Sequence, residues 1–200
     1  MTWFVVSVFF LAVLIGVPVF VVMVYNQLVR SRNAVANQFS DIDVVLNKRY
    51  DLIRNLVEVA KKYLQHEQAT LVQVTQARNT AASALKQIQQ SSGGNAANIG
   101  ALSLADNQLP HALGNLQVAF EAYPDLKADT QMLNLQRELS NIETEVARER
   151  NLYNSYVTEY NNYLQVFPNH LIGKAFSFLP SPWLEVADAK VREAVKVDFS

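Results

Sequence analysis

The N-terminal apolar run constrains this chain more than any other feature. Residues 3–25 carry no charged side chain and are mainly Val, Phe, Leu and Ile. At about 1.5 Å of rise per residue, such a helix crosses a hydrocarbon core of about 30 Å. A cleaved secretory signal is the competing interpretation, but it needs a basic start, a shorter apolar stretch and a small-residue cleavage site, whereas this run ends in Val24-Tyr25-Asn26. We therefore predict an uncleaved transmembrane anchor over residues 1–25.

The anchor also carries signals for flexibility and orientation. Gly16 and Pro18 lie in mid-span, where a membrane helix tolerates a kink; they indicate a hinge or close-packing face, or simply ordinary membrane-helix composition. No basic residue precedes the run, whereas Arg30 and Arg32 follow it. This asymmetry predicts a short N-terminus outside and the remaining chain in the cytoplasm. The residues assigned to the anchor are Trp3, Gly16, Pro18 and Tyr25.

The composition of the remaining chain excludes several classes of function. The full sequence has 17 basic and 18 acidic side chains, with no dense block of Lys and Arg, so nucleic acid is not an expected ligand. It has no cysteine, which excludes disulfides, thiol catalysis and thiolate-bound metal and fits a reducing cytoplasm. The soluble part is long enough for one domain with its own core.

A heptad-like stripe of large or apolar residues follows the anchor. Its members are Phe39, Ile42, Leu46, Arg49, Ile53, Leu56, Ala60 and Tyr63, with Arg49 as the charged break. No Pro or Gly occurs over residues 30–90, so the pattern predicts one helix of up to about 60 residues, or about 90 Å. Ser91-Ser92-Gly93-Gly94-Asn95 then predicts a linker over residues 91–100.

A second stripe follows a break at residues 123–129. Tyr123-Pro124 disrupts a helical segment that starts near Ala101, and Asp129 is a candidate N-cap for the next helix. The second stripe consists of Leu135, Leu139, Ile142, Val146, Glu149, Tyr153, Tyr156, Tyr160, Tyr163 and Phe167. We predict an all-α fold: an antiparallel up-and-down bundle of three to four long helices over residues 26–168, continuous with the transmembrane helix. A kink at Tyr123-Pro124 and a reversal there are both compatible with this pattern.

Polar residues among the stripes are the candidate site. Two charged breaks, Arg49 and Glu149, either pair across the bundle or reach its rim. Amides and phenols can fix helix register through buried hydrogen bonds, or line a groove for a partner helix or small ligand. The candidate residues are Arg49, Asp51, Asn55, Tyr63, His66, Glu149, Arg150, Tyr153, Asn154, Tyr160 and Asn161.

The sequence resembles the LemA family from the membrane exit to the C-terminus. The matching segments are Tyr25-Asn26-Gln27-Leu28-Val29, Arg32-Asn33, Ile42-Asp43-Val44, Lys48-Arg49-Tyr50-Asp51-Leu52-Ile53, Asn55-Leu56-Val57, Tyr63, His66-Glu67, Ala77-Arg78, Glu121-Ala122-Tyr123-Pro124-Asp125-Leu126-Lys127-Ala128, Tyr153-Asn154, Tyr160-Asn161 and Phe167-Pro168. The chain departs from the family at Arg54, where proline is common, and at Ile142, where threonine is frequent.

This resemblance implies a topology more than a mechanism. It implies a single N-terminal membrane helix, a short extracytoplasmic N-terminus and a cytoplasmic helical bundle, in a bacterial inner membrane. The family has no established enzymatic activity. Some relatives help to organise internal bacterial membranes, which is an analogy for this chain.

No catalytic, cofactor-binding or metal-binding constellation is predicted. His66-Glu67 begins like a zinc-protease motif, but residue 70 is Thr, so the second histidine ligand is missing. Asp41 and Asp43 are two residues apart and do not share a helix face. We expect no enzymatic activity and identify no small-molecule substrate or cofactor.

The segment at residues 169–200 is aromatic and partly extended in character. Phe176, Phe178 and Trp183 are its candidate docking residues. They suit a lipid headgroup region, or they fold back over the bundle end, which we favour. Val195-Lys196-Val197-Asp198-Phe199 alternates like a strand and suggests an extended tail docked on the bundle or a partner.

Three functions from different classes remain. The preferred one is a membrane-anchored scaffold that associates with itself or with another membrane protein, because the stripes and the aromatic tail are the concentrated signals. A transmembrane sensor is the second, with Gly16 and Pro18 transmitting a motion, although few residues precede the span. An enzyme with an unrecognised site is the third, and shifted pKa values in a pocket would favour it.

Overall fold

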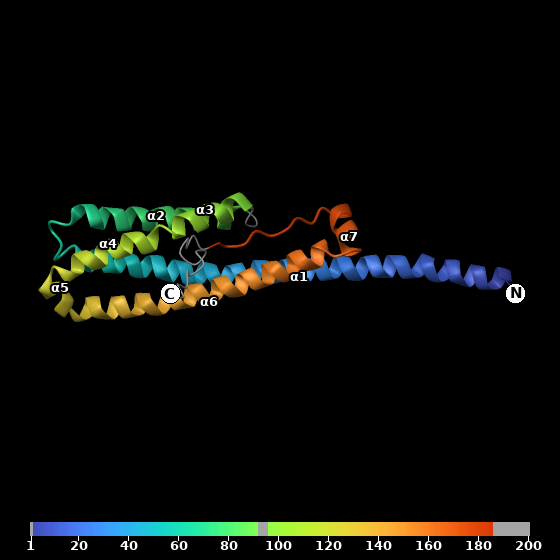
Figure 1. The fold of residues 1–200 in the computed structure, drawn as a ribbon, viewed down its shortest axis with the longest axis horizontal. Helices are drawn as coiled ribbons and strands as arrows, with labels where there is room; N and C mark the ends of the chain where they lie inside the picture. The colour runs from blue at the N-terminus through green and yellow to red at the C-terminus, as the bar shows by residue number, and fades with distance from the viewer. Residues whose placement is uncertain (1, 92–95, 186–200) are drawn as a thin grey trace, which may run out of the picture. The chain divides into compact units, whose positions relative to one another are not determined.

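The computed structural model describes residues 2–91 and 96–185, and their regular structure is helical (Figure 1). The helices are α1 (Thr2–Ala60), α2 (Gln68–Gln90), α3 (Ala96–Asp106), α4 (Leu109–Glu121), α5 (Pro124–Ala128), α6 (Thr130–Gln165) and α7 (Asn169–Ala175). This confirms the all-α prediction. The strand-like segment predicted at Val195–Phe199 lies outside the described residues.

The chain clusters into two compact units. The first unit combines Met1–Ser40 with Asn151–Ser181, and the second combines Asp41–Arg150 with Pro182–Ser200. Both α1 and α6 contribute residues to each unit. The domain boundaries predicted at residues 25 and 168 are based on the sequence pattern. They remain predictions, because the two compact units divide the chain at other residues.

The second unit is an antiparallel helical bundle. The end of α1, then α2, then α3 with α4, and finally the start of α6 run in alternating directions (Figure 1). Each of these helices contributes buried residues to the core. They are Ile42, Leu46, Ile53 and Leu56 of α1; Leu71, Val74, Leu85 and Ile88 of α2; Ile99 and Leu102 of α3; Leu109, Leu116 and Phe120 of α4; and Met132, Ile142 and Val146 of α6. The apolar members of the first stripe from Ile42 to Ala60 therefore face the core of this unit, as an amphipathic helix requires.

The prediction of one unbroken helix over residues 30–90 is wrong. α1 ends at Ala60, and α2 begins at Gln68 after a turn. No Gly or Pro signals this turn, but Leu64 within it is completely buried. Burial of Leu64 outweighs the helix preference of the Lys, Leu, Gln and Glu residues in this segment, because tertiary packing overrides propensity.

The break at residues 123–129 is a reversal. Tyr123 is extended (φ −120°, ψ 93°) before Pro124, as expected for a residue that precedes proline. Asp129 is also extended (ψ 117°), and the short α5 between them leads the chain from α4 back along α6 (Figure 1). The alternative of a simple kink is excluded, and the shorter up-and-down arrangement holds.

The first unit pairs the start of α1 with the end of α6 and with α7. Its buried residues include Val24, Leu28, Val35, Tyr153, Val157, Tyr160, Asn161, Leu164, Ile172 and Phe178. α7 packs closely on α6, since a side chain at Gly173 would clash with Cδ1 of Leu164. A glycine at this position therefore permits the close approach of the two helices.

The prediction that the second stripe faces inward is correct only in part. Its members up to Tyr153 are buried or half-buried, but Tyr156 is 40% and Phe167 73% exposed. Val157 and Leu164 take the inward positions instead. A strict seven-residue repeat drifts by about 20° per heptad around a straight α-helix, so Tyr156 and Phe167 leave the buried face, whereas Tyr160 between them stays buried.

Candidate functional site

A buried cluster of charges lies within the second unit. Arg49 of α1 is only 2% exposed. Its Nη1 donates to both carboxylate oxygens of Asp106, at 2.9 and 3.0 Å, and its Nε donates to Oε1 of Glu143 at 2.7 Å. Charge-assisted hydrogen bonds of this kind are about twice as strong as neutral ones. Arg49 therefore joins α1 to α3 and α6.

Asp106 is the centre of this cluster. It is 5% exposed at the end of α3. Besides Arg49, it accepts a hydrogen bond from the phenol of Tyr50 at 3.2 Å and one from Nη2 of Arg150 at 2.9 Å. A buried carboxylate needs such partners, because the cost of losing water is otherwise not recovered. The cluster holds two guanidinium groups against two carboxylates, those of Asp106 and Glu143.

The cluster shifts the ionisation of two neighbouring groups. Burial raises the pKa of Tyr50 far above its usual value, and the adjacent Asp106 raises this pKa further. Burial also raises the pKa of Glu143, while Arg49 opposes that shift. Tyr50 therefore remains a neutral donor at physiological pH. These groups are committed to one another, which suits a structural anchor better than proton transfer.

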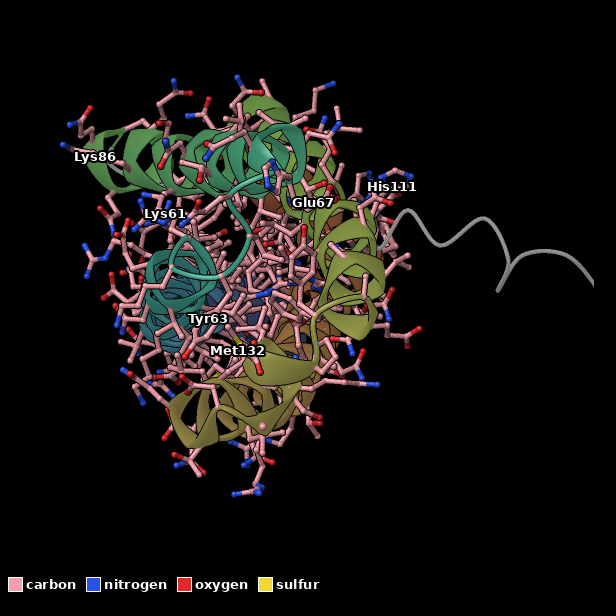
Figure 2. All side chains as sticks on the ribbon, turned by 90° about the vertical axis from the view of Figure 1, so that its left-hand side faces the viewer. Lys61, Tyr63, Glu67, Lys86, His111 and Met132 are labelled. Carbon is pink, nitrogen blue, oxygen red and sulfur yellow. The ribbon has the colours of Figure 1, made fainter. Side chains whose placement is uncertain are left out.

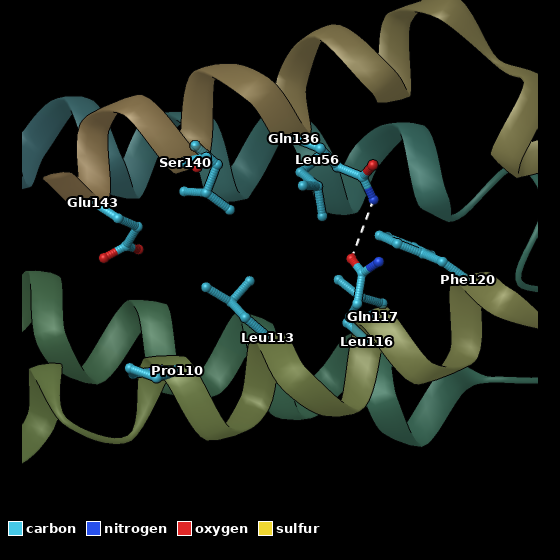
Figure 3. Close-up of a pocket in the computed structure, with 10 residues that line it drawn as sticks. Leu56, Pro110, Leu113, Leu116, Gln117, Phe120, Gln136, Ser140 and Glu143 are labelled. Atoms are coloured by element: carbon cyan, nitrogen blue, oxygen red, sulfur yellow. Dashed lines mark hydrogen bonds between the residues drawn. The ribbon is translucent and has the colours of Figure 1, made fainter. Parts of the chain in front are cut away.

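An apolar cleft of about 410 Å³ lies beside the cluster, between α4 and α6 (Figure 3). It is lined by Leu56, Pro110, Leu113, Leu116, Gln117, Phe120, Gln136, Leu139, Ser140 and Glu143. Leu113 points from α4 toward α6, and Gln136 donates to Gln117 across the cleft at 3.3 Å (Figure 3). Of the lining residues, Glu143 alone is titratable at ordinary pH. The cleft therefore offers apolar contact and amide hydrogen bonds.

The remaining predicted residues of α1 and its turn are not part of this cluster. Asp51 is exposed and forms ion pairs with Arg54 at 3.2 Å and Arg78 at 3.7 Å. Asn55 and His66 are exposed. Within residues 2–91 and 96–185, no three His, Asp or Glu side chains gather as a metal ion would require.

Arg49 and Glu149, the charged breaks in the two stripes, form ion pairs with residues other than those predicted. Arg49 takes Asp106 and Glu143, and its burial contradicts a position at the rim. Glu149 forms an ion pair with its neighbour Arg148, at 2.6 Å. Sequence reasoning missed Asp106, although a signal was present: apart from His111, it is the only ionisable residue between Lys86 and Glu121. A lone acid in such an apolar stretch indicates a buried partner.

Tyr63 and Asp129 close one end of the bundle. Oδ1 of Asp129 accepts from the backbone N–H of Met132 at 2.9 Å, which confirms the predicted N-cap of α6, and Oδ2 accepts from the phenol of Tyr63 at 2.7 Å. Figure 2 views this end, with Tyr63 and Met132 next to each other and Lys86 and His111 toward the outside. The hydrogen bond from the Met132 N–H, then that from Tyr63, lowers the pKa of Asp129 below its ordinary value of 3.8.

We expect Asp129→Asn to be less stable than the native protein at neutral pH, although asparagine still caps the helix. A folded-state pKa below the unfolded one stabilises the fold above the unfolded pKa, and this stabilisation is lost as the pH falls through the folded pKa. Thermal midpoints of both proteins should therefore converge well below pH 3.8. Tyr63→Phe, which keeps the cap, should show a smaller pH dependence than native protein. If the difference between the thermal midpoints of the native protein and Asp129→Asn were the same at every pH, the pH dependence could not be assigned to Asp129.

Polar residues of the first unit hold the segment that follows α7. The phenol of Tyr160 donates to the carbonyl of Leu179 at 2.9 Å. Asn161 donates from Nδ2 to the carbonyl of Ser181 and accepts the Ser181 N–H, both at 2.9 Å. The ring of Tyr153 packs edge-on against Phe39, with centroids 5.8 Å apart, and burial raises the pKa of Tyr153 to about 12. The backbone carbonyl of half-buried Asn154 accepts from Thr158.

The anchor and tail residues occupy contrasting environments. Trp3 is 86% exposed, Gly16 has open space around it, and α1 continues through Pro18. Tyr25 packs against Phe176 and Phe178, of which only Phe178 is buried. In the second unit, Trp183 is 47% exposed, and nearby Ser103 donates from Oγ to the carbonyl of Glu185.

Comparison with known proteins supports the resemblance. A model of the LemA family matches residues 38–199. Protein LemA of Metamycoplasma hominis is 26% identical over 177 residues, which cover 88% of this chain and 74% of that protein. The match therefore extends through both units.

Proposed function

The chain belongs to the LemA family, and we propose that it is a membrane-anchored helical protein that binds other proteins and has no enzymatic activity of its own. The observation that carries the proposal is the apolar cleft of the second unit. A cleft lined by four leucines, Phe120 and Pro110, with the two amides of Gln117 and Gln136, suits the apolar face of an amphipathic helix. Most of the neighbouring charged groups are engaged with one another: Arg49 and Arg150 bind Asp106, and Arg49 also binds Glu143.

Membrane anchoring is proposed through α1. This helix is long and apolar enough to cross a membrane, and it contains an 18-residue window with a mean hydropathy of 3.0 in which no residue is buried. Arg30 and Arg32 follow the apolar run and favour a cytoplasmic bundle. We place the protein in the inner membrane of a bacterial cell, where its partner is a second copy or another membrane protein.

Photo-crosslinking from the cleft tests this proposal. With p-benzoylphenylalanine in place of Leu113, the full-length protein should give a discrete adduct when cells are irradiated. Additional Leu139→Gln, on the facing wall, should reduce the yield because it makes that apolar wall polar. Mass spectrometry of the adduct then distinguishes a second copy from another membrane protein, and light scattering in mild detergent gives the oligomeric state.

The matched control is the same photo-reactive residue at Val118. Val118 lies on the same helix and is 70% exposed, but it does not line the cleft. It should give little adduct, and Leu139→Gln should not change that yield. Equal yields from the two positions, or no effect of Leu139→Gln on the Leu113 adduct, would refute the cleft as a binding site.

A further inference from the structure

We propose that α7 and its flanking residues form a second, interfacial membrane contact beside the point where α1 leaves the bilayer. This inference rests on the proposed anchoring of α1 and goes beyond it, because it assigns lipid binding to a segment about 150 residues further along the chain. The partner is the bilayer itself, at its anionic headgroup region.

The segment formed by α7 and its flanking residues is amphipathic. Ile172, Gly173 and Phe178 are buried against the first unit. Large apolar side chains on the other side face outward: Phe167 is 73%, Leu171 53%, Phe176 52% and Leu179 77% exposed. An outward surface of this kind, formed by large apolar residues close together in the chain, is typical of a binding surface.

The end of α7 shows how the chain produces this arrangement. Ser177 adopts a left-handed conformation (φ 58°), and the N–H of Phe178 bonds to the carbonyl of Gly173 at 2.9 Å. A left-handed residue after a helix end turns the chain sharply. Phe178 consequently points inward, while Phe176 and Leu179 on either side remain exposed.

The segment that contains α7 lies next to the end of the apolar run of α1. The ring of Tyr25, the last residue of the apolar run, packs against the rings of Phe176 and Phe178, with centroids 5.0 and 5.6 Å apart. α7 thus lies beside α1 within the first unit (Figure 1). Val22 and Met23, just before Tyr25, are 57% and 64% exposed. The outward side chains of α7 therefore continue the lipid-facing surface of the anchor, at the level where interfacial segments bury their apolar face by about 5–10 Å.

The first unit, outside the apolar run, has more basic than acidic side chains. Within residues 26–40 and 151–181, the basic side chains are Arg30, Arg32 and Lys174, and the only acidic one is Glu159. The guanidinium of Arg32 lies over the ring of Phe178, 5.2 Å from its centroid, and Lys174 is in the last turn of α7. Basic residues at this depth extend toward anionic headgroups. This balance favours an anionic surface, and the exposed apolar side chains beside it favour a lipid surface over an acidic protein partner.

Spin labels in reconstituted full-length protein test the inference. The chain has no cysteine, so Leu171→Cys and Leu179→Cys each provide one labelling site at an exposed position. The protein is placed in vesicles of phosphatidylcholine with phosphatidylglycerol as the anionic lipid. Accessibility is then measured to oxygen, which concentrates in lipid, and to a water-soluble nickel chelate. In the vesicles, both labels should be more accessible to oxygen and less accessible to the nickel chelate than a label at a water-exposed position.

Two control positions separate this inference from the anchoring proposal. Phe9→Cys, in the anchor, should report lipid, and Val118→Cys, 70% exposed in the second unit, should report water. A lipid signal at Phe9 with water-like labels at positions 171 and 179 would overturn the α7 contact alone. A water signal at Phe9 would overturn the anchor itself. Protection from both reagents with spin–spin broadening would show that a second copy covers α7, and would also overturn the inference.

Discussion

Arg49→Met is expected to lower the free energy of unfolding by about 3–5 kcal/mol, the usual result of removing one partner from a buried ion pair. Methionine fills a similar apolar volume, but it leaves Asp106 with one guanidinium instead of two and Glu143 with none from α1. Asp106 is 5% exposed, so water cannot readily replace the lost hydrogen bonds. The measurement is urea unfolding of the full-length protein in mild detergent, followed by far-UV circular dichroism.

Arg54→Met is the matched control, because Arg54 is also on α1 but 59% exposed and paired with Asp51 at the surface. It should change the free energy of unfolding by no more than about 0.5 kcal/mol. A double variant, Arg49→Met with Asp106→Leu, should cost less than the sum of its single changes, because it removes the stranded carboxylate. A coupling of about 0.5–3 kcal/mol is typical of residues in one network. Equal effects of Arg49→Met and Arg54→Met would show that the cluster does not hold α1, α3 and α6 together.

Apolar periodicity in the sequence encodes which face of a helix is buried, and this determines how much of the fold could be predicted. Apolar spacing identified the buried positions Ile42, Leu46 and Ile53, because the inward face of a helix repeats about every 3.6 residues. It failed at the turn between α1 and α2, where no Gly or Pro occurs and the burial of Leu64 depends on distant helices. It also failed at Tyr156, where the seven-residue repeat drifts away from the buried face.

The site shows a similar division between local and non-local information. Arg49 was recognisable as a charge within an apolar stripe, but its partner Asp106 is 57 residues away. Periodicity along one helix does not specify such a pairing. Tyr160 and Asn161 were also recognisable as polar residues among apolar ones. Their partners are backbone groups of Leu179 and Ser181, which have no signature in the sequence because every residue carries them.

Asn161→Ala is expected to lower the free energy of unfolding by about 2–3 kcal/mol, because it leaves partly buried donor and acceptor groups of Ser181 unsatisfied. Asn161 is 2% exposed, and its amide makes both bonds to the same residue. The effect should be local, releasing the segment after α7 from α6. If the whole effect falls on local opening, the Ser181 amide should exchange roughly 30- to 150-fold faster, since each 1.4 kcal/mol is a factor of ten. Hydrogen exchange with mass spectrometry of peptides that contain Ser181 measures this change.

Asn162→Ala is the matched control, because Asn162 is the next residue of α6 and its side chain is exposed. It should leave Ser181 exchange unchanged. Asn161→Asp keeps an acceptor for the Ser181 N–H but buries a carboxylate with one oxygen against the Ser181 carbonyl, so Ser181 should exchange at least as fast as in Asn161→Ala. Unaltered exchange in Asn161→Ala would mean that other contacts hold the segment. Faster exchange in Asn161→Ala but not in Asn162→Ala would establish that one amide side chain holds Ser181, and with it the segment after α7, against α6.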